Sequence, residues 1–392
     1  MKIMSINAGS SSLKFSLFNM DTKEVLLSGL FERIGIEGSC YTLEYGEYKI
    51  KNEALMETHL DAVKILMDKL LELKIVNSLE EIDGIGHRIV HGGAIYKESV
   101  VVTDKVLDDI IALSDLAPLH NPAHAMCIKA FREVLPNTPM VVVFDTAFHQ
   151  TIAEDRFLYP VPYNWYTDYQ VRKYGAHGTS HRYVAKKLQE ELGRDDLNII
   201  SCHLGNGGSI TAISCGKCVD TSMGFTPHAG IMMGTRSGDI DVSIVPYVME
   251  KEGKSAGEIM NDLNKKSGFL GISGLSSDSR DIEDGIKEGN ERCILAQKMF
   301  VNSVIKYIAQ YYVLLGHVDV IAFTAGIGEK SISTRSDIIE RLAPLGIEID
   351  PEENNVRGKF KKISSKKSSV DIYVVPTNEE LMIAEDTLNL IK

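Results

Sequence analysis

The sequence predicts an α/β fold made of two copies of one domain. Segments with the patterns of strands and helices alternate along all 392 residues, and the composition, with 44% apolar and 24% charged residues, is that of a globular protein. Two patterns recur in the same order. MSINAGSSSLKFSLF (4–18) is echoed by ISCHLGNGGSITAIS (200–214), and IDGIGHRIVHGG (82–93) by IAFTAGIGEKS (321–331). This repetition predicts a duplicated domain with a boundary near residue 150.

The individual elements follow from local patterns, taken in chain order. Short strands flank the opening turn, apolar residues then recur with a helical period, and three later apolar runs have the length of buried strands. The expected elements are strands at 2–6 and 13–18, a helix at 55–73, and strands at 140–144, 197–202 and 318–323. The apolar stretch 293–315 contains Gln297, Lys298 and other polar residues, so we expect a buried amphipathic helix there and not a membrane span.

Charge and cysteine content argue against several classes of partner. A net charge of −12 disfavours nucleic acid, because a phosphate backbone requires a surplus of Lys and Arg. No secretion leader is visible and six Cys make no disulfide framework in a chain of this size, so we expect a cytoplasmic protein. Cys215 and Cys218 have the spacing of a zinc or redox pair, but there is no second pair and Gly216-Lys217 is interpreted as a hairpin turn. The basic run 359–369 is interpreted as a solvated loop or hairpin.

Two glycine-rich turns between strands are candidates for binding phosphate. They are Gly9-Ser-Ser-Ser12, followed by Lys14, and Gly205-Asn-Gly-Gly-Ser209. Such turns point successive backbone N–H groups into one concavity, and glycine allows a phosphate to approach closely. Neither has the spacing of a P-loop, and neither is a dinucleotide fingerprint, because a strand follows each turn where that motif has a helix. One such turn is weak evidence, but two from duplicated domains indicate a nucleotide-phosphate site.

Polar residues lie close to these turns in the sequence. Arg88 and Arg236 stand beside glycines, and the simplest interpretation of each alone is a structural ion pair. His177 and His181 have the i, i+4 spacing of helical zinc ligands but lack a third ligand, and we expect a helix capped by Thr179 or Ser180 there.

Two carboxylates lie at the ends of expected secondary-structure elements. Asp145 ends a buried strand, and ligands of open α/β sheets gather at such strand ends. A carboxylate with two arginines and glycine turns suits phosphoryl transfer, in which guanidinium groups neutralise the phosphoryl oxygens. Near the C-terminus, Thr377 and Glu380 fit a capping box, which leaves Glu379 available for a metal.

Taken together, these motifs closely resemble those of the acetate kinase family. NAGSSSLKF, HRIVHGG, LAPLHNP, FDTAFH, HGTSH, HLGNGGS, DTSMGFTP, MMGTRSGDID, AGIGE and TNEEL occur in family order between residues 7 and 381. The resemblance implies two ribonuclease H-like domains of the actin, sugar-kinase and heat-shock ATPase superfamily, with the active site in the interdomain cleft. It implies an N-terminal domain of residues 1–150 with 379–392, and a C-terminal domain of residues 151–378 that carries most nucleotide contacts and the interface of a homodimer.

The resemblance further implies a Mg²⁺-dependent transfer of the γ-phosphoryl group of ATP to acetate, which yields acetyl phosphate and ADP. Asn7 and Glu379 would serve Mg²⁺, for which Mn²⁺ could substitute. Arg88 would bind the acyl carboxylate, Asp145 would be the catalytic acidic residue, and His177 and Arg236 would stabilise the transition state. The implied nucleotide contacts are Lys14, His203, Leu204, Gly205, Asn206, Gly207, Asp278, Ser279, Arg280, Gly326, Ile327, Gly328, Glu329 and Lys330.

The acyl pocket of the family corresponds to Val90, Leu119, Ala176 and Pro227. The residue at position 176 is usually aromatic, so alanine leaves space for propionate or butyrate as alternative substrates. A second alternative is a nucleotide switch without catalysis on the same fold. Lys330 replaces a usual Asn next to the expected adenine region. Because a carboxylate acceptor has a pKa of roughly 4 and is ionised at neutral pH, no general base is needed. Asp145 is therefore interpreted as positioning the metal or the arginines.

Overall fold

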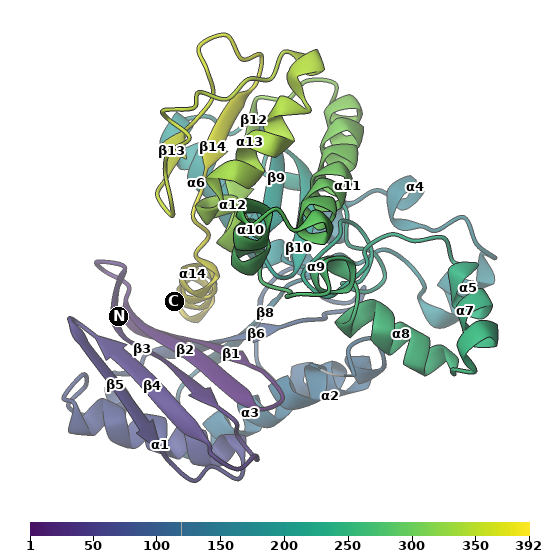
Figure 1. The fold of residues 1–392 in the computed structure, drawn as a ribbon. Helices are drawn as coiled ribbons and strands as arrows, with labels where there is room; N and C mark the ends of the chain where they lie inside the picture. Colours follow the sequence, from purple (N-terminus) through teal and green to yellow (C-terminus); the bar gives the residue numbers. More distant parts are fainter. Residues whose placement is uncertain (119) are drawn as a thin grey trace. The chain divides into compact units, whose positions relative to one another are not determined.

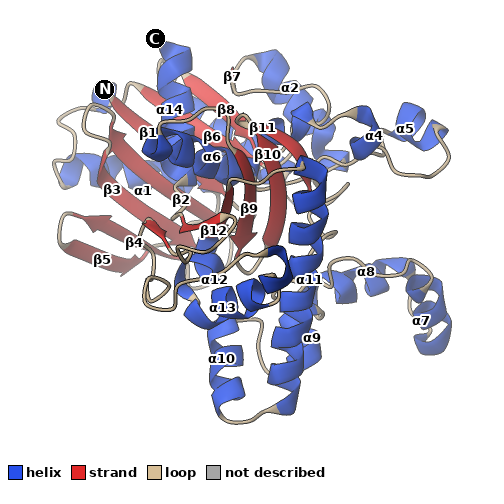
Figure 2. Ribbon diagram, turned by 90° about the horizontal axis from the view of Figure 1, so that it is seen from above, coloured by secondary structure: helices blue, strands red, loops and turns tan. Residues whose placement is uncertain are grey.

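The computed structural model describes residues 1–118 and 120–392, and the chain forms two compact units (Figure 1). The first unit consists of Met1–Phe148 together with Asn378–Lys392, and the second unit of His149–Thr377. Each is an α/β structure with its own sheet; the strands are red in Figure 2.

The first unit is built on an eight-stranded sheet with the order β5-β4-β3-β2-β1-β6-β8-β7. Its strands are β1 (Lys2–Ala8), β2 (Ser12–Asn19), β3 (Glu24–Glu32), β4 (Cys40–Tyr45), β5 (Tyr48–Glu53), β6 (Gly84–Ile89), β7 (Val100–Val101) and β8 (Met140–Phe144). Strands β1 to β5 form an antiparallel meander, whereas β6 and β8 run parallel to β1. The expected strands at 2–6, 13–18 and 140–144 are all present, and the last has the predicted bounds.

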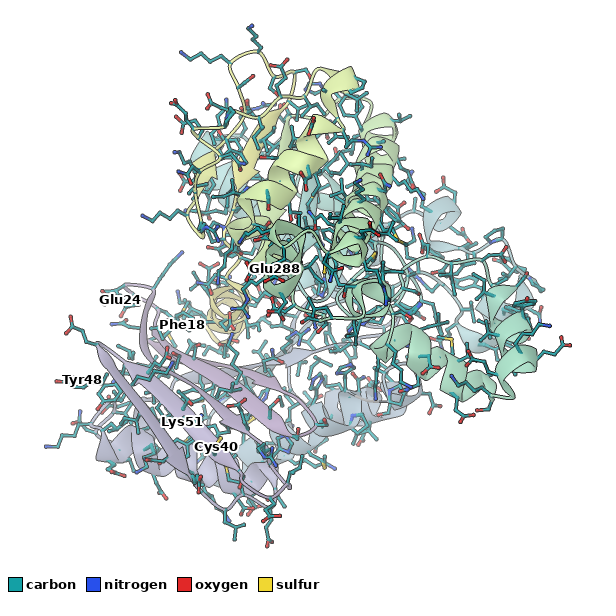
Figure 3. All side chains as sticks on the ribbon, in the orientation of Figure 1. Phe18, Glu24, Cys40, Tyr48, Lys51 and Glu288 are labelled. Atoms are coloured by element: carbon teal, nitrogen blue, oxygen red, sulfur yellow. The ribbon has the colours of Figure 1, made fainter. Side chains whose placement is uncertain are left out.

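Helices cover both faces of this sheet (Figure 1). They are α1 (His59–Glu72), α2 (Asp104–Ala112), α3 (Asn121–Val134) and α14 (Glu379–Ile391), with single 3₁₀ turns at Leu79–Glu81 and Leu113–Asp115. Because successive strand residues point to opposite faces, Met4 and Ile6 lie in the core with α1 and α3, whereas Ile3 packs against α14 through Ala384. Phe18, labelled in Figure 3, belongs to the same cluster as Ile3. The C-terminal helix thus completes the first unit.

The second unit repeats this topology with six strands in the order β11-β10-β9-β12-β14-β13. The strands are β9 (Asn198–Leu204), β10 (Gly208–Ser214), β11 (Lys217–Thr221), β12 (Val320–Thr324), β13 (Lys361–Lys362) and β14 (Asp371–Val374). Antiparallel β9, β10 and β11 correspond to β1, β2 and β3, and β12 and β14 run parallel to β9 as β6 and β8 do to β1. Both pairs of echoed sequences therefore occupy equivalent strands, which confirms the predicted duplication.

The helices of the second unit differ in how deeply they are buried. They are α4 (Glu154–Phe157), α5 (Asn164–Tyr169), α6 (Gly178–Leu192), α7 (Ile244–Glu252), α8 (Ala256–Lys265), α9 (Gly268–Ser273), α10 (Ser279–Lys287), α11 (Glu291–Leu315), α12 (Ala325–Lys330) and α13 (Ile332–Glu340), with a 3₁₀ turn at Ala343–Leu345. The 3₁₀ turn Ala147–Thr151 spans the boundary along the chain at which the first unit ends. Helix α11 buries one face, including Phe300 and Val304, in the core, as predicted. None of the helices in the described part of the chain combines the length and hydropathy of a membrane span.

Three local predictions are wrong. The β10–β11 hairpin turns at Cys215-Gly216, one residue before the predicted pair, because these two residues adopt the positive φ angles of 49° and 73° that such a tight turn requires. Helix α6 begins at Gly178 after a left-handed His177, so Thr179 and Ser180 lie inside its first turn and do not cap it.

The third concerns the C-terminal helix. Asn378, and not Thr377, caps α14 by accepting a hydrogen bond from the backbone N–H of Leu381. The predicted capping box with Glu380 is therefore absent.

Candidate active site

The first unit brings together Asn7, Arg88 and Asp145 at neighbouring strand ends. Nε of Arg88 donates to both carboxylate oxygens of Asp145 at 3.2 and 3.0 Å, and its Nη2 donates to Oδ2. Nη1 of Arg88 donates to Oδ1 of Asn7 at 3.1 Å. Because a guanidinium carries five N–H donors, these contacts leave two for another acceptor. Asp145, which is 1% exposed, thus fixes an arginine that still has donors for a ligand.

Glu379 belongs to the same group. It is the first residue of α14, and although burial opposes the charge of Arg88, the carboxylates of Asp145 and Glu379 raise the pKa of this guanidinium above its ordinary value. Burial, together with the neighbouring Asp145, raises the pKa of Glu379 above that of an exposed carboxyl, although Arg88 lowers it. The group therefore contains more carboxylate than its one cation balances. Lys14 forms an ion pair with Glu380 in the same unit and is about half exposed.

A second cluster surrounds the Gly205–Ser209 turn in the second unit. A Cβ on Gly207 would lie 3.6 Å from Nη1 of Arg236 and 3.6 Å from both Cε1 and Nε2 of His177. The guanidinium and the imidazole thus converge on one position over this glycine. Nη1 of Arg236 donates to the carbonyl of Pro227 at 3.0 Å and approaches Sδ of Met233 at 3.6 Å.

Arg236 lacks a counterion in its own unit. It is half-buried, and among the second-unit residues that the structure describes it forms no ion pair with a carboxylate. Burial lowers the pKa of this guanidinium, because removing the cation from water is not offset by a nearby anion. A partly desolvated arginine and a histidine aimed at one glycine form a site that favours an anion.

A cavity of about 530 Å³ lies in the second unit. Eight of its lining residues are among the expected nucleotide contacts: Gly205, Asn206, Asp278, Ser279, Arg280, Gly326, Ile327 and Lys330. Asp278 caps α10 by accepting from the backbone N–H of Arg280 at 2.9 Å, and its carboxylate also holds the guanidinium of Arg280. The side chain of Arg280 and this backbone contact lower the pKa of Asp278 to about 2.

The remaining expected nucleotide residues do not line this cavity. The side chain of Leu204 is fully buried and Gly328 lies in the core with its carbonyl bonded to Arg335. Oε1 of Glu329 accepts from the backbone N–H groups of Ala325 and Thr377 at 2.8 and 3.1 Å, which is a structural role. His203 stacks on His177 with ring centroids 4.1 Å apart. The expected contacts from Gly326 to Lys330 lie in the short helix α12 (Ala325–Lys330).

Four cavity residues were not predicted: Ser277, Glu283, Ser331 and Arg357. Glu283 lies one helical turn after Ser279 on α10, so extending the helix from its Asp278 cap would have found it. Ser331 directly follows the predicted Lys330. Arg357 stands in a loop with no motif around it, and a single sequence gives no signal for it.

The expected acyl-pocket residues are distributed over both units. Val90 follows β6 in the first unit and is 8% exposed. In the second unit, Ala176 packs in a small buried cluster with Met223 and Met233. The prediction for Leu119 falls outside the described residues.

The cysteine pair is split between environments, because Cys215 is exposed whereas Cys218 is buried. In the described part of the chain, no three His, Cys, Asp or Glu side chains form a group that could hold a metal.

Comparison with known proteins shows to which family this chain belongs. A sequence profile of the acetokinase family matches residues 2–385. The chain belongs to the acetokinase family. It is 53% identical over 390 residues to the acetate kinase of Aster yellows witches'-broom phytoplasma, covering 100% of this chain and 95% of the relative.

Solved structures of acetokinases agree with this assignment. The acetate kinase of Porphyromonas gingivalis superposes with a TM-score of 0.96 at 44% identity, covering 100% of both chains. The propionate kinase of Francisella tularensis gives 0.94 at 43% identity over 99% of both chains. Acetokinases are phosphotransferases with a carboxyl group as acceptor, so the chain is an enzyme of this class. The predicted α/β fold of two units and the family resemblance are thereby confirmed.

Proposed function

We propose that the chain transfers the γ-phosphoryl group of ATP reversibly to acetate, by direct in-line attack, to give acetyl phosphate and ADP. The observation that carries this proposal is the convergence of Nη1 of Arg236 and Nε2 of His177 over Gly207, where Arg236 forms no ion pair with a carboxylate of its own unit among the described residues. Such a site suits the negative oxygens of a phosphoryl group in transit. In the reaction, a carboxylate oxygen of acetate forms a bond to Pγ while the bond from Pγ to the bridging oxygen of ADP breaks.

The acceptor side requires an anion-binding group and no base. Because acetate has a pKa of roughly 4, it is ionised near neutral pH and no proton is removed on attack. Arg88 retains two N–H donors after its contacts with Asp145 and Asn7, which is enough to orient one carboxylate. Asp145 then acts by holding the guanidinium plane in place, as its bidentate contact supports.

The phosphoryl side requires positive charge, because the main barrier is the approach of one anion to a polyanion. Arg236 and His177 supply donors to the equatorial oxygens as the group passes from the nucleotide to acetate. Gly207 leaves the space between them open, since any side chain would extend into it.

A divalent cation fits the residues of the first unit. Glu379, Asn7 and Asp145 offer the oxygen atoms that Mg²⁺ prefers, and Glu379 is buried close to a second carboxylate, that of Asp145. We propose that Asn7 and Glu379 hold Mg²⁺, or Mn²⁺ in its place. When bound, the cation neutralises phosphate charge and orients the transferring group.

ATP or ADP is proposed to occupy the 530 Å³ cavity. Arg280, held by Asp278 at the start of α10, supplies a preorganised cation to a phosphate, and Lys330 a second one. We propose that Lys14 and His203 make further contacts with the phosphates of the nucleotide.

A longer acid is the second candidate substrate. Ala176 removes an aromatic ring from the expected acyl pocket, which favours propionate or butyrate, and the propionate kinase likeness agrees with this alternative. Against it, Met223 and Met233 pack beside Ala176, and flexible methionines can refill such a space. Comparing kcat/KM for acetate, propionate and butyrate decides between them, because a pocket of acetate size disfavours each added methylene by about 10-fold or more.

The proposed function is tested by a hydroxamate assay with ATP, Mg²⁺ and these acids. Arg88→Ala should abolish transfer and leave nucleotide binding intact, because Arg88 serves the acceptor. Arg132→Ala is the matched control in the same unit, since Arg132 forms an exposed ion pair with Asp104. Nucleotide binding without transfer to any acid by the unaltered protein would favour the nucleotide-switch alternative. Undiminished transfer by Arg88→Ala would contradict the proposed role of this residue.

We also propose that the enzyme is a homodimer that associates through its second unit. Helices α5 and α7 bury none of their residues within the unit, and they and the segment before α7 expose Trp165 (44%), Tyr169 (66%), Val242 (78%) and Tyr247 (62%). Large exposed apolar side chains of this kind are typical of an interface. Light scattering of Tyr247→Asp should show a shift towards monomer; an unchanged mass would contradict this surface.

A further inference from the structure

Two histidines and two serines of the second unit form one continuous chain of hydrogen bonds. Oγ of Ser209 lies 2.9 Å from Nδ1 of His177 and 2.8 Å from Nε2 of His181. Nδ1 of His181 lies in turn 2.8 Å from Oγ of Ser201. The i, i+4 histidine pair at the start of α6 thus shares the hydroxyl of a serine on β10, and Ser201 on β9 ends the chain.

The part of this chain behind His177 is closed to solvent. His181, Ser201 and Ser209 are each 0% exposed, so water does not compete for their hydrogen bonds. Burial lowers the pKa of His181 well below its ordinary value, with smaller contributions from His203 and His149, and its imidazole is therefore neutral near pH 7. A neutral imidazole carries one N–H and a hydroxyl carries one O–H, so, when every hydrogen is used within the chain, a donor at one end determines every other donor.

With both imidazoles neutral, two directions of donation keep the O–H of Ser209 within the chain. If Ser201 donates to Nδ1 of His181, then Nε2–H of His181 donates to Ser209, and Ser209 donates to Nδ1 of His177. The proton of His177 then resides on Nε2. In the opposite direction His177 donates from Nδ1, and its Nε2 presents a lone pair.

The surroundings of His177 select the first direction. Its Nε2 and Nη1 of Arg236 converge over Gly207, where an anion requires donors and a lone pair would repel it. The ring plane is also constrained, because His203 stacks on it at an interplanar angle of 21°. We propose that Ser209 is a positioning residue, supported by His181 and Ser201, that holds His177 in the Nε2–H tautomer aimed at the transferring phosphoryl group. This inference rests on the proposed function for the role of His177.

The tautomers can be measured without any assay of activity. Imidazole ¹⁵N chemical shifts of the full-length chain labelled at histidine, with His177 assigned from the signal lost in His177→Gln, report which nitrogen carries each proton. We expect the N–H of both His177 and His181 on Nε2 in the wild-type chain. A proton on Nδ1 of His177 would overturn the proposal, whatever the protein catalyses.

Variants test the consequence for catalysis. Ser209→Ala should lower kcat about 10- to 100-fold with KM for ATP and for the acid changed less than about threefold, because orientation of a catalytic group and not substrate binding is lost. The ¹⁵N shifts of His177 should move away from the pure Nε2–H form. Ser201→Ala, at the far end, should act in the same direction with a smaller loss.

The matched control is Thr211→Val. Thr211 is the next residue on the same face of β10, is 0% exposed, and bonds to Thr221 outside this chain. It should keep the kcat of the wild type. Unchanged kcat in Ser209→Ala, or an equal loss in Thr211→Val, would overturn the proposal. Should Ser209→Ala fail to fold, the wild-type tautomer and Ser201→Ala decide the question. Absence of any phosphoryl transfer by the wild type would instead refute the proposed function. The tautomer measurement does not depend on activity, so the two failures can be told apart.

Discussion

Replacing Gly207 by alanine tests the site in the second unit most directly, because the added methyl group fits the protein but not the ligand. Its Cβ would lie 3.6 Å from Nη1 of Arg236 and from Nε2 of His177, which is an ordinary van der Waals distance. Gly207 does not adopt a left-handed backbone conformation, so alanine introduces no strain. The folded protein should tolerate the change and, through the less flexible unfolded chain, gain about 0.4–1 kcal/mol of stability.

The expected loss of activity follows from the same distances. A phosphoryl oxygen that accepts from both donors must lie about 2.7–3.1 Å from each, in the space that the methyl group occupies. Losing two hydrogen bonds to charged groups, each worth about 1.5–3 kcal/mol, removes about 3–6 kcal/mol of transition-state stabilisation. Since about 1.4 kcal/mol is tenfold in rate, kcat/KM should fall roughly 10²- to 10⁴-fold.

The assay is the steady-state formation of the acyl phosphate, trapped as hydroxamate, together with thermal unfolding of the same sample. Gly257→Ala is the matched control, because Gly257 lies in α8 of the same unit and a Cβ there meets no atom within 4 Å. It should retain full activity. A folded Gly207→Ala protein with wild-type kcat/KM would refute the argument that Arg236 and His177 act together over this glycine.

Three further perturbations address the first unit. Asn378→Ala removes the side chain that accepts from the N–H of Leu381 and should lower the free energy of unfolding by about 1 kcal/mol in urea; no loss would refute its capping role. Burial lowers the pKa of His87 to about 3, so the native state excludes a proton that the unfolded chain binds below its ordinary value of 6.5, and stability is lost as pH falls from 6.5 towards 3. His87→Leu should flatten that pH dependence by up to about 1.4 kcal/mol per pH unit, and an unchanged slope would contradict this. Glu379→Gln should raise the KM for Mg²⁺ about 10-fold or more yet strengthen acetate binding without metal, measured by calorimetry; unchanged values for both would argue against a metal role for Glu379.

Elements set by local pattern were predictable from the sequence. Strand β8 has the predicted bounds because all five of its residues are apolar and all are buried. The duplication was visible because a strand–turn–strand unit around a glycine constrains residue types over a short range, and both echoed pairs proved to occupy equivalent strands. The family resemblance rested on many such motifs in order.

Boundaries that depend on distant partners were not predictable. Thr377 and Asn378 are both good capping residues, and the neighbours of Thr377 decide between them. The hydroxyl of Thr377 bonds to Ser180 and its backbone N–H donates to Glu329, far away in the chain. These contacts leave Asn378 to cap α14, and the sequence shows neither of them.

Within the candidate site, it was easier to predict which residues take part than to predict which charged groups surround them. Arg88 and Arg236 both stand beside glycines in the sequence, and a structural ion pair was an equally simple interpretation of each. The structure separates them, because Arg88 has a carboxylate partner and Arg236 has none in its own unit. No local pattern reports whether a guanidinium has a counterion, since the partner lies on another strand.

This contrast in charge gives the two arginines different chemical uses. Arg88 lies with Asp145 and Glu379, so with both carboxyls ionised the group carries one positive and two negative charges. An anionic acceptor is therefore attracted only weakly until a cation balances the excess, which links its binding to the metal. The positive charge of Arg236 is not neutralised by a carboxylate of its own unit and is available to a ligand, although its burial costs desolvation free energy. The environment of Arg88 therefore suits a carboxylate acceptor with a single negative charge, which is oriented by hydrogen bonds. The environment of Arg236 suits the more highly charged phosphoryl group.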